Sequence, residues 1–87
     1  MPEVWVTPAM QRVTGGRQRL RVSGSTIRRV IDSLEAECPG IRPHLCEGDE
    51  IVPGLAVVVD GMDSGLGMMQ PVEEDSEVHF IPAIAGG

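Results

Sequence analysis

The sequence contains no lysine, no asparagine and no tyrosine among its 87 residues. Without lysine, the chain offers no side-chain amine for an isopeptide bond, and without asparagine it has no acceptor for N-linked glycosylation. Its length is enough for one domain with a thin core, which leaves little room for a deep active site. We therefore expect a carrier, a binding module or a subunit rather than an enzyme.

Long apolar runs are also missing. The longest is Leu55–Val59, whereas a membrane-spanning helix needs about 20 apolar residues. The first six residues include Glu3 and alternate like a strand, which differs from the basic and then apolar start of a signal peptide. The sequence therefore predicts a cytoplasmic protein that does not bind membranes.

Basic residues are scarce beyond the first third of the chain. Residues 1–31 hold six of the seven arginines and one acid, whereas residues 32–87 hold one arginine and twelve acids, for a net charge of −6. A nucleic-acid-binding protein needs an excess of basic side chains facing phosphates. We expect no nucleic-acid partner. The acidic part is either a solubilising surface or a face that attracts a basic partner.

Cysteine is represented only by Cys38 and Cys46. A secreted domain of this size usually has more disulfides, so free thiols are expected. A metal site formed by Cys38, His44 and Cys46 would match no common zinc-ligand spacing, and we expect no bound metal. A protein that works through these two thiols remains an alternative.

Two short strands open the chain. Val4–Thr7 is rich in β-forming residues, and Gln18–Ser23 alternates apolar with basic side chains. The glycines of Thr14–Gly16 between them indicate a turn. These segments predict a hairpin.

One helix is expected after this hairpin. Ser25 or Thr26 can cap its start, and Cys38-Pro39 ends it because proline cannot continue the hydrogen-bond ladder. Its apolar residues recur at helical spacing along one face: Ile27, Val30, Ile31 and Leu34.

The middle of the chain is less regular. Ile41–Leu45 predicts a short turn with both end residues inward, and the polar, acidic Cys46–Pro53 predicts a mobile loop. Leu55–Val59 reads as a strand, and its continuous apolar run indicates a central position in a sheet. A turn at Asp60-Gly61 and a loose glycine-rich stretch over Asp63–Gly67 follow.

The last strand is predicted over Glu77–Ile81, with Val78 and Phe80 inward and Pro82 as its end. The order of elements predicts an α+β fold with a mixed sheet and one main helix packed across one face. We divide the chain into a domain over residues 1–82 and a tail over residues 83–87.

The final residues, Phe80-Ile81-Pro82-Ala83-Ile84-Ala85-Gly86-Gly87, give the most specific pattern. A last strand followed by proline and a Gly-Gly end resembles the ThiS/MoaD-type ubiquitin-like sulfur carriers. The helix opened by Ser25-Thr26-Ile27 and closed by Cys38-Pro39-Gly40-Ile41 is similar to the branch that serves molybdopterin synthase and cysteine synthesis. The resemblance implies the β-grasp fold. Where the family often has Gly-Asp before the last strand, this chain has Asp75-Ser76.

The resemblance also implies a mechanism that uses the C-terminus. The Gly87 carboxylate would be adenylated and converted to a thiocarboxylate that donates sulfur for molybdopterin, cysteine or a related metabolite. The chain itself would bind no cofactor, because a partner supplies ATP and Mg²⁺. The residues expected to enter the partner's active site are Ala83, Ile84, Ala85 and Gly86. The alanines keep this tail slim, and glycine without a Cβ fits a narrow channel.

Strand phase predicts the surface that meets the partner. If Val78 and Phe80 face the helix, the alternate residues His79 and Ile81 face outward. Residues at the same phase of the neighbouring strands face outward with them. This predicted partner surface consists of Trp5, Ala56, Val58, His79 and Ile81, with Arg19 and Arg21 beside them. Exposed apolar side chains on a small protein often mark an interface.

Three partners are expected: an adenylating activating enzyme, a sulfur donor (a protein or sulfide), and an enzyme that accepts the sulfur. Two other readings remain open. In the first, the chain is a ubiquitin-like modifier conjugated through Gly87. In the second, it is a non-catalytic β-grasp interaction domain. The sequence does not decide which sulfur product is made.

Overall fold

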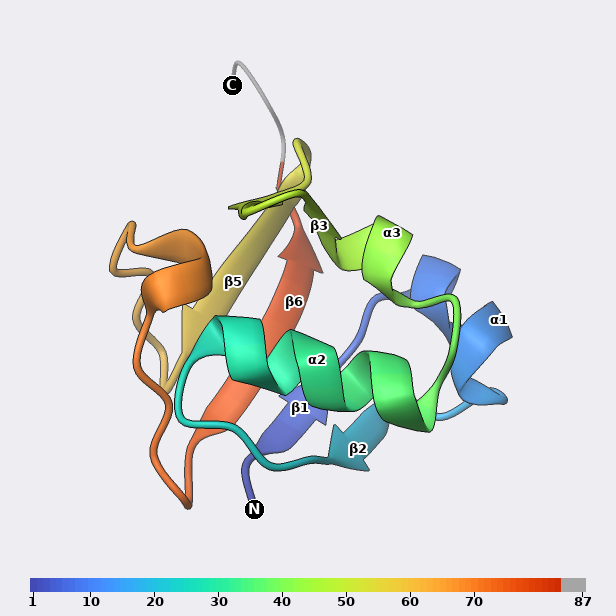
Figure 1. The fold of residues 1–87 in the computed structure, drawn as a ribbon, viewed down its shortest axis with the longest axis horizontal. Helices are drawn as coiled ribbons and strands as arrows, with labels where there is room; N and C mark the ends of the chain where they lie inside the picture. The colour runs from blue at the N-terminus through green and yellow to red at the C-terminus, as the bar shows by residue number, and fades with distance from the viewer. Residues whose placement is uncertain (84–87) are drawn as a thin grey trace.

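The structure is a computed structural model that describes residues 1–83. A four-stranded mixed sheet forms one layer and a single long helix crosses one of its faces (Figure 1). The sheet contains β1 (Glu3–Trp5), β2 (Arg19–Arg21), β5 (Leu55–Val59) and β6 (Glu77–Pro82) in the order β2-β1-β6-β5. β1 runs antiparallel to β2 and parallel to β6, and β5 runs antiparallel to β6.

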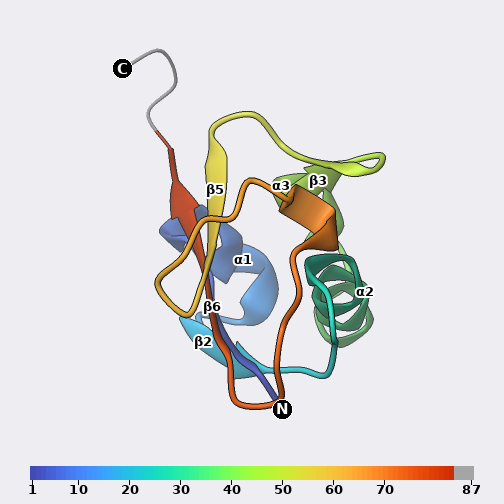
Figure 2. The same ribbon diagram turned by 90° about the vertical axis from the view of Figure 1, so that its left-hand side faces the viewer.

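The helix is α2 (Ile27–Glu37), and its predicted start and end are confirmed. Thr26 caps it: the Thr26 side-chain oxygen accepts a hydrogen bond from the Arg29 backbone N–H at 3.3 Å. The four apolar residues predicted on one face are fully buried against the sheet. Figure 2 shows the two layers edge-on, with α2 on one side of the strands.

The predicted hairpin at the start of the chain is also confirmed. β1 and β2 pair with Val4 opposite Leu20. Their connection contains two short helices that the sequence did not predict, η1 (Pro8–Met10) and α1 (Gln11–Thr14). Gly15 ends α1 in a left-handed conformation, with φ of 72°, as the glycine pair predicted.

The segment after α2 differs in part from the prediction. Ile41 and Leu45, on either side of α3 (Arg42–Leu45), are buried as expected. The prediction of a mobile loop over Cys46–Pro53 is wrong. β3 (Cys46–Glu47) and β4 (Glu50–Ile51) pair there as a two-stranded sheet. The two residues between them are Gly48 and Asp49, a pair typical of tight hairpins, and Gly48 has φ of 59°.

The predicted central position of β5 is wrong, because β5 borders the sheet. Its apolar run has another cause. Val57 and Val59 point into the core, whereas Ala56 and Val58 are half-buried on the opposite face of the sheet. The run therefore combines a core face with a partly exposed apolar face.

The last strand ends at Pro82, one residue beyond the predicted range Glu77–Ile81. β6 includes Pro82, which lies opposite Leu55, and the Ala83 N–H donates to the Gly54 carbonyl at 2.8 Å. Residues alternate in the direction of their backbone bonds, so the Pro82 nitrogen faces the β1 side. β1 ends at Trp5 and pairs with β6 only as far as His79, so proline removes no bond from this ladder.

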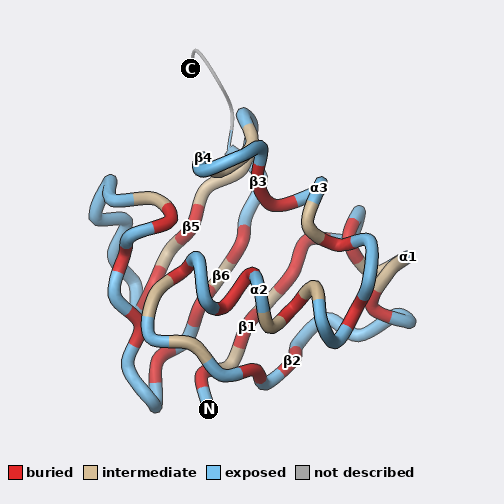
Figure 3. The backbone as a smooth tube through the Cα atoms, in the orientation of Figure 1, coloured by how far each residue is buried: buried red, intermediate tan, exposed pale blue. Residues whose placement is uncertain are grey.

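The core lies between the sheet and α2 (Figure 3). Val78 and Phe80 are buried there, as predicted. The glycine-rich stretch leads into a short helix, η2 (Gly67–Met69), which packs beside α2 and places Met68 in the core. Within residues 1–83, no helix has the length and apolar character needed to cross a membrane.

Candidate functional site

The face of the sheet opposite α2, called here the outer face, brings together all five residues of the predicted partner surface. Alternation along each strand puts Val4, Val57 and Val78 in the core and their neighbours outward. The outward residues come from β1, β5 and β6: Trp5, Ala56, Val58, His79 and Ile81. What these residues bind stays a prediction.

A row of side chains crosses the outer face. Strand register places Trp5 opposite both Arg19 and His79, and His79 opposite Val58. The Trp5 and His79 rings are stacked, with centroids 4.4 Å apart and an interplanar angle of 5°. The Arg19 guanidinium carbon lies 5.8 Å from the Trp5 ring centroid, within cation–π range. The row thus presents a flat aromatic surface with a positive charge at one end.

Ile81 and Ala56 form the next pair along the strands towards the end of β6. Ile81 is 42% exposed, although it belongs to a strand that is hydrogen-bonded to its neighbour. Burying such a side chain at an interface is worth about 1.5–3 kcal/mol. Ile81 is exposed, whereas the other four residues of the predicted partner surface are half-buried.

Charged groups border this apolar centre. Glu3 lies 3.5 Å from the Arg19 guanidinium and 3.3 Å from that of Arg21. The His79 imidazole lies 3.6 Å from the Glu77 carboxylate. These pairs are largely exposed, so each contributes little to stability, but they hold the side chains in a defined arrangement.

β6 ends at the surface of the domain. Pro82 and Ala83 are both exposed, and Ala83 is the last described residue. The remaining tail residues of the prediction, Ile84, Ala85, Gly86 and Gly87, lie outside the described residues. Of the predicted tail, the structure therefore places only Ala83.

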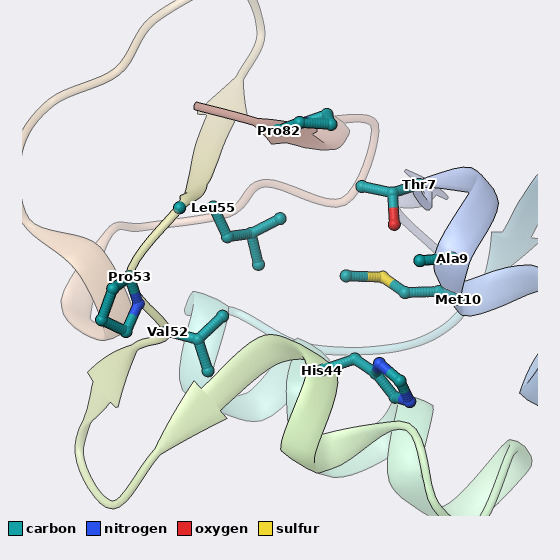
Figure 4. Close-up of a pocket in the computed structure, with 9 residues that line it drawn as sticks. Thr7, Ala9, Met10, His44, Val52, Pro53, Leu55 and Pro82 are labelled. Carbon is teal, nitrogen blue, oxygen red and sulfur yellow. The ribbon is translucent and has the colours of Figure 1, made fainter. Parts of the chain in front are cut away.

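A groove of about 220 Å³ lies beside Pro82 and was not predicted (Figure 4). Leu55, Val52 and Met10 point into it, and His44 lies at its border. The residues that line it come from five segments: Thr7, Ala9, Met10, His44, Val52, Pro53, Gly54, Leu55 and Pro82. Because they are scattered along the chain, no local sequence pattern could have indicated the groove.

The opposite end of β6 is fixed by Asp60. Its carboxylate accepts hydrogen bonds from the Glu77 N–H at 2.9 Å and from the Ser76 hydroxyl at 2.7 Å. The Glu77 N–H, and after it the Ser76 hydroxyl, hold the pKa of the Asp60 carboxyl below its ordinary value. Ser76 is buried, and its hydroxyl oxygen also accepts from the Glu73 N–H at 2.8 Å. Asp75-Ser76 thus belongs to a turn that is held by side-chain bonds.

The two cysteines are free thiols, and both are buried. The Cys38 sulfur accepts a hydrogen bond from the Arg17 guanidinium at 3.3 Å. In the described part of the chain, no three His, Cys, Asp or Glu side chains lie close enough together to hold a metal ion. Cys38 and Cys46 contribute to the core.

The mixed sheet, the crossing helix and the extended last strand define a β-grasp, ubiquitin-like domain. The sequence pattern of the ThiS family matches residues 7–87, which is nearly the whole chain. This chain belongs to the ThiS family. Members of this family are small carrier proteins rather than catalysts, and the fold is that of the ubiquitin-like sulfur carriers.

Solved structures support the same fold. A chain of the Amycolatopsis orientalis BexX/CysO complex is 25% identical, covers 100% of both chains and superposes with a TM-score of 0.91. CysO from Mycobacterium tuberculosis is 24% identical over 97% of this chain and 100% of its own, with a TM-score of 0.89. SAMP1 from Haloferax volcanii is 21% identical over 99% of this chain and 98% of its own, with a TM-score of 0.71. No curated protein matches the sequence.

Proposed function

We propose that this chain is a sulfur carrier whose C-terminal Gly87 carboxylate is adenylated by a partner enzyme and converted to a thiocarboxylate. The observation that supports this most strongly is the family match, which extends to Gly87. In the described part, β6 leads from the sheet to an exposed Ala83. Between Ala83 and the reactive end, the chain contains only Ile84, Ala85 and Gly86.

The chemistry requires an activated carboxyl group. A C-terminal carboxyl group has a pKa of about 3.5 and is ionised at neutral pH. One of its oxygens attacks the α-phosphate of ATP, and pyrophosphate leaves. Hydrogen sulfide anion then attacks the carbonyl carbon of the acyl adenylate, AMP leaves, and a C–S bond replaces a C–O bond. The thiocarboxylate keeps the sulfur in a form that a third protein can use.

The chain contributes recognition and reach to this sequence of reactions. The outer face supplies an apolar and aromatic surface for the activating enzyme, centred on Trp5, His79 and Ile81. ATP and Mg²⁺ are bound by that enzyme. A relative of this fold has been crystallised in a complex with BexX, which supports the proposal that this chain binds partner proteins. We place the protein in the cytoplasm and expect its sulfur to serve molybdopterin, cysteine or a related metabolite.

Intact-mass analysis tests the proposal. The full chain is incubated with the activating enzyme, ATP and sulfide, and its mass should rise by roughly 16 Da as sulfur replaces oxygen. A variant that lacks Gly87 and a variant extended by three residues serve as matched controls. Both should keep their mass, because the deletion moves the reacting group by about 3.3–3.6 Å and the extension converts the Gly87 carboxylate into an amide.

A protein modifier is the second candidate. It would use the same adenylate, but an amine of another protein would attack it and form an amide. The likeness to SAMP1, a small archaeal modifier protein, motivates this candidate, although it establishes the fold alone. Protein conjugates that form without any gain of 16 Da (about one S-for-O exchange) in the free chain would favour the modifier.

A further inference from the structure

The two edge strands of the sheet, β5 and β2, differ in whether their outward backbone groups are hydrogen-bonded. At β5, Val59 exchanges two hydrogen bonds of 2.9 Å with Met62, and the Leu55 N–H donates to Val52 at 3.2 Å. Both ends of this edge are thus bonded by the chain itself. β2 is the other border strand, and its edge is open.

Two hydrogen bonds show which backbone groups of β2 are free. The Val6 N–H donates to Gln18 at 3.0 Å, and the Val22 N–H donates to Pro2 at 3.3 Å. The even-numbered residues of this segment therefore bond to β1. In an antiparallel pair, the residues between them direct their N–H and C=O groups the other way. Arg19 and Arg21 thus present these groups outward, and no other segment among residues 1–83 bonds to them.

Positive charge lies along this open edge. The segment from Arg12 to Arg21 contains four arginines and no acid. The side chains of Arg19 and Arg21 are 63% and 72% exposed and share one carboxylate, that of Glu3. A guanidinium has five N–H donors, so both retain donors for a further acceptor.

A groove accompanies the same edge on the side of the helix. It has a volume of about 270 Å³ and lies between β2 with the residues after it and the second half of α2. Met1, Val22 and Ala36 give it apolar walls, and the rest of its lining is polar or charged: Arg21, Ser23, Ser33 and Glu37. Side chains of a strand added beside β2 would point alternately to the two faces of the sheet. Those on the outer face would lie beside the arginines, and those on the helix side would lie beside this groove.

We propose that the open edge of β2 binds an acidic peptide segment in an extended conformation, which adds a fifth strand to the sheet. Backbone bonds to Arg19 and Arg21 supply the pairing, as in other complexes formed by strand addition. Acidic side chains of the peptide lie on the outer face beside the arginines, and its apolar side chains lie towards the groove. This site is separate from the proposed chemistry at Gly87.

Charge disfavours a second copy of this chain as the occupant. Two β2 strands paired edge to edge would place Arg19 and Arg21 beside the same arginines of the other molecule. Like charges on directly opposite strands are destabilising. An acidic segment instead pairs each arginine with a carboxylate.

The test uses a fluorescein-labelled peptide of nine residues that alternates valine with aspartate or glutamate, titrated with the full chain. A peptide with lysine in place of the acids is the matched control. The acidic peptide should bind, with affinity that falls as salt rises, and the lysine peptide should not. Failure of the acidic peptide to bind below about 1 mM would overturn the proposal.

Two double variants locate the site. R19Q/R21Q should weaken binding at least about fivefold. R28Q/R42Q changes the net charge equally but removes arginines that pair with Asp49 and Asp32, and it should change affinity less than about twofold. Equal effects of the two variants would contradict the proposed position.

Amide hydrogen exchange gives a second readout. Exchange at Arg19 and Arg21 should slow on binding, since their N–H groups enter a ladder. Unchanged exchange at both residues, or dimerisation of the chain through β2 without peptide, would overturn the proposal. In that case the arginines would serve to keep other strands away from the edge.

Discussion

At the scale of single residues, Asp60 shows how one side chain positions a strand. It adopts φ of 51°, a left-handed conformation that aspartate tolerates better than most residues. Its carboxylate binds the Glu77 N–H and the Ser76 hydroxyl at the start of β6. The sequence predicted the turn at Asp60-Gly61. It did not predict these bonds, because their partners lie 16 and 17 residues further along the chain.

Replacement of Asp60 by asparagine should lower stability at neutral pH. Asparagine keeps the backbone preference and the size of the side chain, but its amide nitrogen cannot accept a hydrogen bond. The pKa of the Asp60 carboxyl is lowered in the folded state. Its stabilising effect is therefore full above the unfolded pKa of about 3.9 and is lost as the pH falls from there through the lower folded-state pKa.

Thermal denaturation of wild type and D60N at pH 7 and pH 3 measures this effect. The difference in Tm between the two proteins should be largest at pH 7 and smaller at pH 3. A difference that stays constant or grows on acidification would show that the Asp60 charge does not hold β6.

At the scale of elements, sequence patterns predicted those whose determinants are local. The four apolar positions of α2 and the cap at Thr26 lie within the helix and its first turn, and both were correct. The β3–β4 hairpin was missed because the polar, acidic composition of this segment indicated a loop, although the pair Gly48-Asp49 is typical of a tight turn. β5 was placed wrongly because periodicity cannot distinguish burial on both faces from an exposed apolar face.

Gly24 fixes how the chain enters α2. A Cβ added there would lie 2.6 Å from the Val30 backbone nitrogen and 2.8 Å from a methyl carbon of Val30. We expect Gly24→Ala to lower the free energy of unfolding by about 1–3 kcal/mol, the usual cost of overpacking.

Urea denaturation of G24A beside Ser25→Ala measures the cost. Ser25 is an exposed neighbour, so its substitution should change stability by less than about 0.5 kcal/mol. Equal stabilities for G24A and wild type would show that the loop before α2 does not need this close approach.

At the scale of the whole molecule, strand phase predicted the composition of the outer face from sequence alone. It did not predict the Trp5–His79 stack, which depends on the parallel register of β1 and β6. The groove beside Pro82 was missed because its residues come from distant segments. The chain therefore presents an aromatic row, a polar border and a groove around the end of β6.

The outer face should bind the activating enzyme. Ile81→Asp places a charge where an apolar contact is expected. Burial of the Ile81 side chain at the interface contributes about 1.5–3 kcal/mol to binding. Its loss should weaken binding roughly 10- to 150-fold. Titration of the folded variant against the enzyme, with calorimetric or fluorescence detection, gives the ratio of affinities.

Met69→Asp is the matched control for this substitution. Met69 is 66% exposed but belongs to η2, on the helix side of the sheet. Its replacement should leave affinity within about twofold of wild type. If Ile81→Asp binds as tightly as Met69→Asp, the outer face is not the surface that the activating enzyme recognises.

The most direct test of the sulfur-carrier function locates the sulfur within the chain. After incubation with the activating enzyme, ATP and sulfide, the protein is cleaved after glutamate to release the fragment Val78–Gly87, which is then sequenced by tandem mass spectrometry. We predict a gain of roughly 16 Da confined to fragment ions that contain Gly87. A C-terminal fragment of unchanged mass, although the activating enzyme has released pyrophosphate from ATP, would contradict it.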